Sequence, residues 1–163
     1  MGRSNVTNKG FKVKNASVSD IHRGMVACAP SNSLKPVFRF TAQIIIMNHP
    51  GEIHPGYAPY CYCHTDTFAV KFVEIVQKLD KRTGKVVEEK PKSIKAGESG
   101  LVVMEPHRLV CVETFQNVPP LGRFVIRDNN LTVAVGIIKS IEYHVPNIKG
   151  GKPVNNQKSK YFR

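Results

Sequence analysis

Residues 67–79, TFAVKFVEIVQKL, are rich in β-branched and aromatic side chains, and this stretch decides the fold. Its alternation predicts a strand with Phe68, Val70, Phe72 and Glu74 on one face and Ala69, Lys71, Val73 and Ile75 on the other. Residues 74–79 also have the propensity to form a helix, which competes with the strand assignment. However, residues 80–85, DKRTGK, have the composition of a hairpin turn, and Val86 and Val87 then resume the strand pattern. We therefore expect a long strand that continues through a hairpin into a second strand.

The same pattern recurs on both sides of this hairpin. Further strands are predicted over residues 38–47, 57–64, 101–104, 110–112, 123–127 and 131–141. The last two are separated only by residues 128–130, DNN, which predict a tight hairpin because Asp and Asn tolerate left-handed backbone. Closely spaced strands with Gly and Pro turns and no long helix indicate an all-β fold, an antiparallel barrel or sandwich over residues 38–143. We expect Val133 and Val135 to face its core.

The two ends of the chain differ from this body. The formal net charge is +12, and residues 144–163 hold five cations and no acid. We expect a flexible basic tail that binds polyanions, the alternative being a solvated segment that only favours solubility. The cations of this tail are Lys149, Lys152, Lys158, Lys160 and Arg163. Ahead of the body, residues 10–14 and 24–28 are short strand candidates, and residues 29–37 have the composition of a linker.

The cysteines and histidines suggest no metal site and no catalytic set. Cys61 and Cys63 form one C-x-C pair, and no second pair stands at zinc-ribbon spacing. Alternation sends both to one strand face and His64 to the other, so we expect two buried structural thiols. His107 and Cys111 lack a third group that could orient them as base and nucleophile. We therefore expect neither catalytic nor metal-binding residues in this chain.

No segment suggests a membrane or a secretory route. The opening residues, MGRSNVTNKG, contain no apolar run, and no stretch approaches the roughly 20 apolar residues that span a bilayer. Free thiols are the default in a reducing compartment. We therefore expect a cytoplasmic protein with no membrane partner.

Several strings resemble the elongation factor 1-alpha family. They are GFKVKN (10–15), FTAQIIIMNHPG (40–51), PGYAP (55–59), PPLGRF (119–124) and TVAVG (132–136). Their order and spacing agree with the family over roughly residues 10–143. The resemblance implies that residues 38–143 form the family's third domain, a Greek-key β-barrel. It also implies that residues 1–28 are the last strands of the second barrel.

The resemblance further implies a function for the longer parent protein. Family members are GTPases that deliver aminoacyl-tRNA to the ribosome, and their third barrel contacts the T stem of the tRNA. This chain contains no G-x-x-x-x-G-K-[ST] motif, so GTP and Mg²⁺ are expected to bind a domain that it lacks. The positions that match the family's tRNA contacts are His64, Thr65, Thr67, Arg127, Asn129 and Thr132. Asn130 and Leu131 replace the family's usual Arg-Gln, which reduces the attraction to phosphate.

Two questions stay open at this level. The chain could be a piece of an elongation factor or a truncated stand-alone paralogue, a non-catalytic binding or structural module for RNA, actin or a larger assembly. Residues 6–28 could stay mobile, dock onto the third domain or complete a sheet supplied by another chain. Arg123, within the GRF string, is expected to form a structural ion pair in the barrel.

Overall fold

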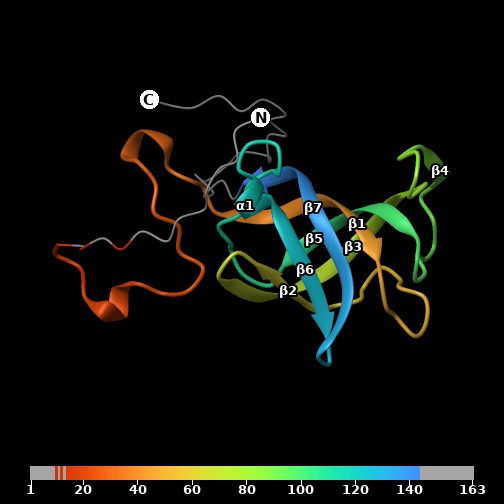
Figure 1. Ribbon diagram of the computed structural model, residues 1–163, viewed down its shortest axis with the longest axis horizontal. Coiled ribbons are helices and arrows are strands. Elements are labelled where there is room, and N and C mark those ends of the chain that lie inside the picture. Colours follow the sequence, from red (N-terminus) through yellow and green to blue (C-terminus); the bar gives the residue numbers. More distant parts are fainter. Residues whose placement is uncertain (1–9, 11, 13, 144–163) are drawn as a thin grey trace, which may run out of the picture.

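Seven strands account for almost all of the regular structure (Figure 1). The computed structural model describes residues 10, 12 and 14–143. The strands are β1 (Val37–Ile46), β2 (Tyr60–Cys63), β3 (Asp66–Leu79), β4 (Val86–Glu89), β5 (Ser99–Pro106), β6 (Arg123–Asp128) and β7 (Leu131–Tyr143). The described helices are the one-turn α1 (Pro119–Gly122) and two 3-10 turns, η1 (Val18–Asp20) and η2 (Pro30–Asn32). The predicted strand over residues 110–112 is reduced to one bridge, between Val110 and Val37.

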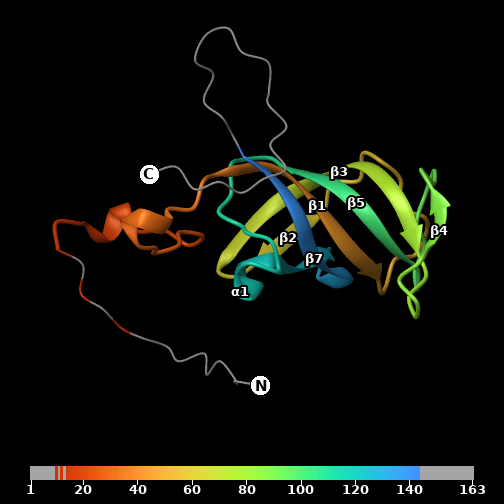
Figure 2. The ribbon, with the colours of Figure 1, turned by 90° about the horizontal axis from the view of Figure 1, so that it is seen from above.

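The strands close into an antiparallel barrel. Their order is β2-β6-β7-β1-β5-β3, and a further pairing between β2 and β3 joins the two ends. β4 continues β3 as a hairpin arm outside the closed barrel. The connections from β1 to β2 and from β5 to β6 cross to non-neighbouring strands, as in a Greek key. The predicted all-β antiparallel barrel is thus confirmed, and Figure 2 shows the strands enclosing its interior.

One continuous core fills the barrel. Alternate residues of β1 point inward, and Phe40, Ala42, Ile44 and Ile46 are fully buried. Phe40 packs edge-on against Phe124 of β6, with ring centroids 5.8 Å apart. Each such aliphatic or aromatic side chain contributes about 1.5–3 kcal/mol when it is removed from water. Apolar burial therefore holds the described barrel together without a disulfide, since its cysteines are free.

Two irregularities move side chains to the opposite face from the one that alternation predicts. In β3 the pairing shifts between Phe72 and Glu74, so Glu74 is exposed and Ile75 is buried, the reverse of the prediction. In β7 the pairing shifts between Ala134 and Thr132, and Val133 is the extra residue. Val133 is buried as predicted, whereas the prediction for Val135 is wrong because Val135 lies on the outer face. Each shift acts as a β-bulge, which inserts one residue and reverses the alternation beyond it.

The segment that precedes the barrel is not a sheet. Residues 14–36 contain the turns η1 and η2 and project from one end of the barrel (Figure 2). The predicted strand over residues 24–28 is therefore wrong, and the one over residues 10–14 lies partly outside the described residues. Of the residues between 14 and 36 whose burial is described, only Gly24 is buried, because it docks against the barrel at Asp66. The division of the chain at residues 28 and 37 stays a prediction, and the five tail cations lie outside the described residues.

Candidate nucleic-acid interface

The six residues predicted to contact RNA lie in two groups at opposite ends of the β2–β6 ladder. Cys63 pairs with Phe124 at the end that leads into the β2–β3 turn. Tyr60 pairs with Arg127 at the other end, next to the β6–β7 turn. Three residue steps along a strand separate the ends, which corresponds to about 10 Å. The structure therefore brings His64, Thr65 and Thr67 together, and separately Arg127, Asn129 and Thr132.

A chain of hydrogen bonds fixes the β2–β3 turn. The backbone N–H of Gly24 donates to Thr65 Oγ1 over 3.2 Å, and that oxygen lies 3.3 Å from His64 Nδ1. His64 Nε2 lies 3.0 Å from the carbonyl oxygen of Cys111 and must carry the hydrogen, because a carbonyl only accepts. Thr65 is therefore engaged within the protein. His64, Thr65 and Thr67 are all exposed.

The buried carboxylate of Asp66 stabilises this turn. Asp66 is 4% exposed and forms an ion pair with Arg108, which comes from the segment after β5. Asp66 Oδ1 also accepts the backbone N–H of Thr67 over 2.9 Å. Gly24 has a φ of 94°, and a Cβ at that position would come within 2.6 Å of the Asp66 carboxyl carbon. The sequence analysis missed this cluster, since its members are about 40 residues apart and no local pattern links them.

The β6–β7 turn has the geometry predicted from its sequence. Asn129 and Asn130 have φ values of 45° and 67°, the left-handed pair that a tight hairpin requires. Arg127 Nη2 donates to the carbonyl of Asn130 over 3.0 Å. Its guanidinium also lies 5.6 Å from the ring centre of Tyr62, and its Nε is buried without a partner among the described residues. Arg127 is therefore held in place, with further donors on the guanidinium, while Asn129 is exposed.

Two tyrosines occupy the surface between the turns. Tyr60 and Tyr62 alternate with the buried Cys61 and Cys63 along β2 and are 58% and 40% exposed. The alternation that places Cys61 and Cys63 in the core also places Tyr60 and Tyr62 on the outer face, so the sequence contains this signal. Arg123 on β6 is exposed, and its predicted ion pair is wrong because no acid of the described part of the chain pairs with it. Aromatic rings beside cations form a surface that suits nucleic acid.

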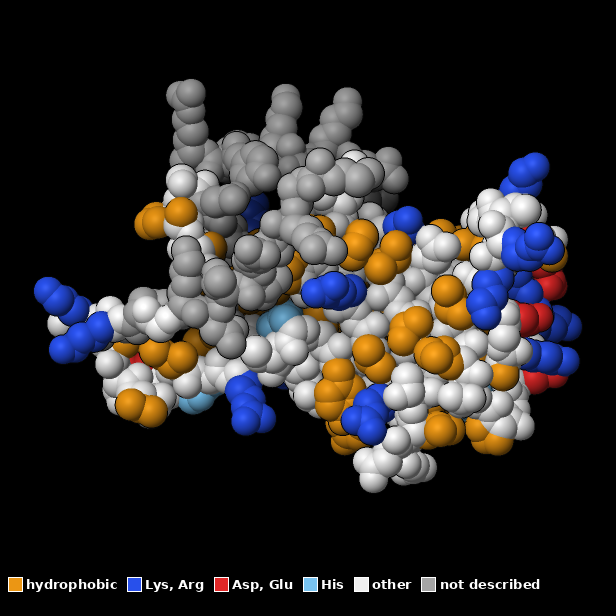
Figure 3. Space-filling model, viewed as in Figure 1, with side chains coloured by type: hydrophobic (Ala, Val, Ile, Leu, Met, Phe, Trp, Pro, Cys, Tyr) orange, Lys and Arg blue, Asp and Glu red, His pale blue; other side chains and the backbone are white. Residues whose placement is uncertain are grey.

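The acidic groups close to this surface are already engaged. Asp128 Oδ2 accepts the hydroxyl of Tyr57 over 2.9 Å. Burial, followed by this bond to Asp128, raises the pKa of Tyr57, so the phenol remains the donor. Among the described residues, charged side chains of both signs gather instead at the β4 end, on the right of Figure 3. On this surface the cations Arg123 and Arg127 therefore stand beside one carboxylate, Asp128, which is held by Tyr57.

The predicted burial of Cys61 and Cys63 is confirmed. Both are at most 1% exposed. Burial is the main cause that raises the pKa of both thiols, to about 12 for Cys63, and the charge of Asp66 adds to it. Within residues 14–143, no group of three or more His, Cys, Asp or Glu side chains is placed to hold a metal. None of the described helices has the length and apolar character needed to cross a bilayer.

Comparison with known proteins identifies the family. Residues 39–139 match the family model described as GTP-eEF1A C-terminal domain-like. The chain is 52% identical over 136 residues to elongation factor 1-alpha of Onchocerca volvulus, and 55% identical over 136 residues to that of Plasmodium falciparum (isolate K1 / Thailand). These alignments cover 83% of this chain but only 29% and 31% of the relatives. A solved structure of sup35 complexed with GDP aligns at a TM-score of 0.72 and 33% identity, over 78% of this chain and 31% of that one. The chain therefore belongs to the elongation factor 1-alpha family, in which it matches the C-terminal domain.

Proposed function

We propose that this barrel contacts aminoacyl-tRNA as part of an elongation factor that delivers the tRNA to the ribosome. The supporting observation is the identity of 52–55% to proteins named elongation factor 1-alpha over 83% of the chain. In this proposal GTP and Mg²⁺ bind the part of the factor that the chain does not cover. The barrel itself has no catalytic role, and the factor works in the cytoplasm.

The proposed contact is with the T stem of the tRNA. A-form RNA is recognised through its phosphates and 2′-hydroxyl groups, because its major groove is too narrow for side chains. Thr67 and Asn129 offer an exposed hydroxyl and an exposed amide group beside the two turns, while the exposed His64 ring is held in place by hydrogen bonds to both of its nitrogens. Turns about 10 Å apart can meet two separate stretches of RNA backbone. Thr65 is exposed as well, and its hydroxyl accepts the backbone N–H of Gly24, which fixes its position in this surface.

The β6–β7 turn makes a weaker contribution than the resemblance alone implies. Leu131 is 45% exposed, and Asn130 carries no charge. Counterion release scales with the number of cations that meet phosphates. The electrostatic contribution of this turn therefore rests on Arg127 alone, part of which is committed to Tyr62 and to the turn carbonyl.

Fluorescence anisotropy with a labelled T-stem minihelix, titrated with the whole chain at several salt concentrations, tests the proposal. Thr67→Val keeps the shape of the side chain and removes one hydroxyl, so binding should weaken about threefold to tenfold. Arg127→Gln should reduce the salt slope by about 1. Lys81→Gln, in the distant β3–β4 turn, is the matched charge control and should have a smaller effect on the slope.

Equal effects of Arg127→Gln and Lys81→Gln would show that the chain attracts RNA only through its total charge. No binding to the minihelix by a folded chain would refute the proposal. That result would favour the alternative, a non-catalytic module that binds another kind of partner.

A further inference from the structure

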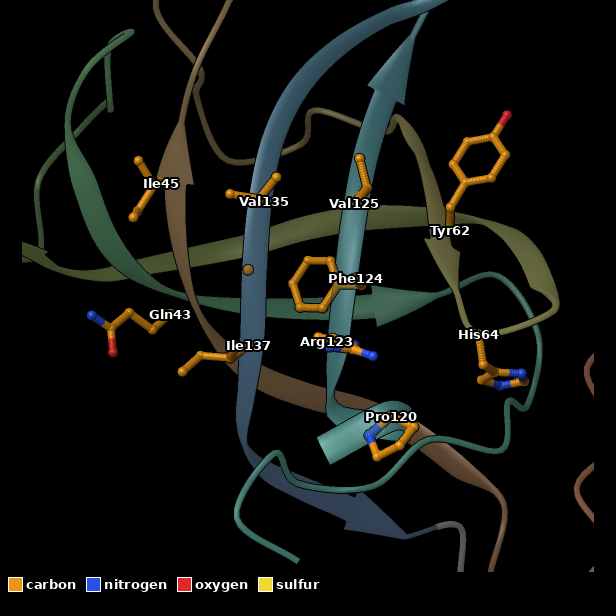
Figure 4. A pocket seen from close by; sticks show the side chains of 11 residues that line it. Gln43, Ile45, Tyr62, His64, Pro120, Arg123, Phe124, Val125, Val135 and Ile137 are labelled. Carbon is orange, nitrogen blue, oxygen red and sulfur yellow. The ribbon is translucent and has the colours of Figure 1, made fainter. Parts of the chain in front are cut away.

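A groove of about 690 Å³ lies on the outer face of the barrel, across β1, β7, β6 and β2 (Figure 4). We propose that this groove binds a peptide segment of a partner protein in which apolar side chains stand next to acidic ones. The residues that carry the argument are Ile45, Tyr62, Val125, Val135, Ile137 and Arg123. The strand register arranges these side chains in two rows.

The first row is apolar. Ile45 pairs with Val135, Val135 with Val125, and Val125 with Tyr62, so four neighbouring strands place these side chains side by side. Neighbouring strands lie about 4.8 Å apart, which makes the row about 14 Å long, the length of about four extended residues. Ile45, Val125 and Val135 are only half-buried in the barrel. A contiguous row of incompletely covered aliphatic side chains can pack against apolar side chains of a partner.

The second row ends at one cation, Arg123. Gln43 pairs with Ile137, and Ile137 pairs with Arg123. His64 also lines the groove at the Arg123 end, as Figure 4 shows. Arg127 stacks on Tyr62 beside the groove. The described lining contains no Asp or Glu, so an occupant should present acidic groups next to its apolar side chains.

The chemistry of the groove favours protein over RNA as its occupant. Aliphatic walls such as Ile45 and Val135 bury apolar side chains, whereas RNA is bound through phosphates, hydroxyls and stacked bases. The chain's own tail, residues 144–163, carries five cations and no acid, and it would be repelled by Arg123. A separate partner with acidic and apolar residues is the complementary occupant. The groove shares His64 with the six predicted RNA contacts, and Tyr62 and Arg123 with the surface between the two turns. Variants at Ile45 and Val135, which lie outside that surface, therefore separate the two proposals.

A peptide library displayed on phage and selected against the whole chain tests the inference. Random dodecamers should enrich for sequences in which Asp or Glu lies within two residues of Leu, Ile or Phe. The enriched peptide is then synthesised with a fluorescent label and measured by anisotropy. Two variants of this peptide, one with Lys for each acid and one with Ser for each apolar residue, should bind about tenfold more weakly.

Protein variants locate the binding. Val135→Gln and Ile45→Gln remove apolar wall without adding charge, and each should weaken the peptide about tenfold while tRNA binding stays unchanged. Val87→Gln is the matched control, since Val87 is 68% exposed on β4 and outside the groove. Arg123→Glu should reverse the preference between the acidic peptide and its Lys version.

The inference would be overturned by the failure of any peptide to be enriched, by the enrichment of basic peptides, or by equal effects of Val135→Gln and Val87→Gln on folded protein. Competition between tRNA and the peptide, with equal losses of both in Val135→Gln, would assign the groove to the RNA surface. That outcome would refute the peptide site and support the proposed function.

Discussion

Aspartate substitutions at Val133 and Val135 test the bulge that divides the core from the groove. Val133 is 1% exposed, whereas Val135 is half-buried on the outer face. Val133→Asp loses about 1.5–3 kcal/mol of apolar burial. The new polar group has no partner in the described core, which costs about 2–7 kcal/mol more. The two losses together amount to about 3.5–10 kcal/mol, a large part of the roughly 5–15 kcal/mol that stabilises typical domains.

At Val135 the same change should be mild. The carboxylate reaches water there, so the loss is limited to part of the apolar contact and to the low β-propensity of Asp, about 1 kcal/mol. Val87→Asp on the exposed β4 measures the propensity effect alone. We expect the melting temperature to fall by about 15 °C or more for Val133→Asp and by about 5 °C or less for Val135→Asp.

Far-UV circular dichroism is the assay, because the chain contains no tryptophan. Burial would raise the pKa of the carboxyl group that Val133→Asp introduces, so the destabilisation should be greatest at neutral pH and should shrink as the pH falls through that raised pKa. Equal losses at the two positions, or a larger loss for Val135→Asp, would refute the assignment of Val135 to the outer face.

Three further predictions follow from the described contacts and from the tail. Asp66→Asn removes the charge that pairs with Arg108 and should lower the free energy of unfolding by about 1–3 kcal/mol. The loss is less than for a fully buried pair because Arg108 is 44% exposed. Urea denaturation measures the free energy of unfolding, and a smaller loss for Asp66→Asn than for Asp80→Asn would contradict the role of the cluster. Maleimide at pH ~8, followed by mass spectrometry, should modify the exposed Cys28 well before the buried Cys63. The pKa of Cys63, about 12, leaves little thiolate at that pH, so its labelling rate should rise with pH. Equal labelling rates at Cys28 and Cys63 would show that the barrel opens readily. Deletion of residues 146–163 removes five cations, so the slope of log K for RNA binding against log salt concentration should become shallower by up to about 4. An unchanged slope would refute polyanion binding by the tail.

Local sequence patterns predicted the strands and turns well. Residues 67–79 form one long strand despite their helix propensity at the C-terminal end, since the hairpin over residues 80–85 and the cross-strand pairing favour strand. Asn129 and Asn130 adopt left-handed backbone as predicted, because short polar side chains tolerate it. These features depend on residues within a few positions of each other, and a single sequence contains that information.

Features that depend on pairing between distant strands escaped prediction. Strict alternation failed at Ile75 and Val135, because a bulge becomes visible only when both paired strands are counted. The Asp66–Arg108 pair and its contact with Gly24 join three separate segments. Residues 24–28 have a strand-like composition but pair with no described strand, and backbone hydrogen bonds with a neighbour are what make a strand. The residues predicted to contact RNA flank two turns, and only the strand register shows that these turns lie at opposite ends of β2 with two tyrosines between them.

The bulge at Val133 connects the stability of the barrel to its outer surface. The carbonyl of Val133 accepts the backbone N–H groups of Met47 and Asn48, over 2.8 and 3.3 Å, so β7 is tied to the end of β1 at the position of the extra residue. Beyond it, Ala134 and Ile138 turn into the core and Val135 and Ile137 turn outward. Without the extra residue, Val135 would be a core residue and the groove would lose the centre of its apolar row. A single inserted residue therefore determines which valine stabilises the fold and which one is available to a partner.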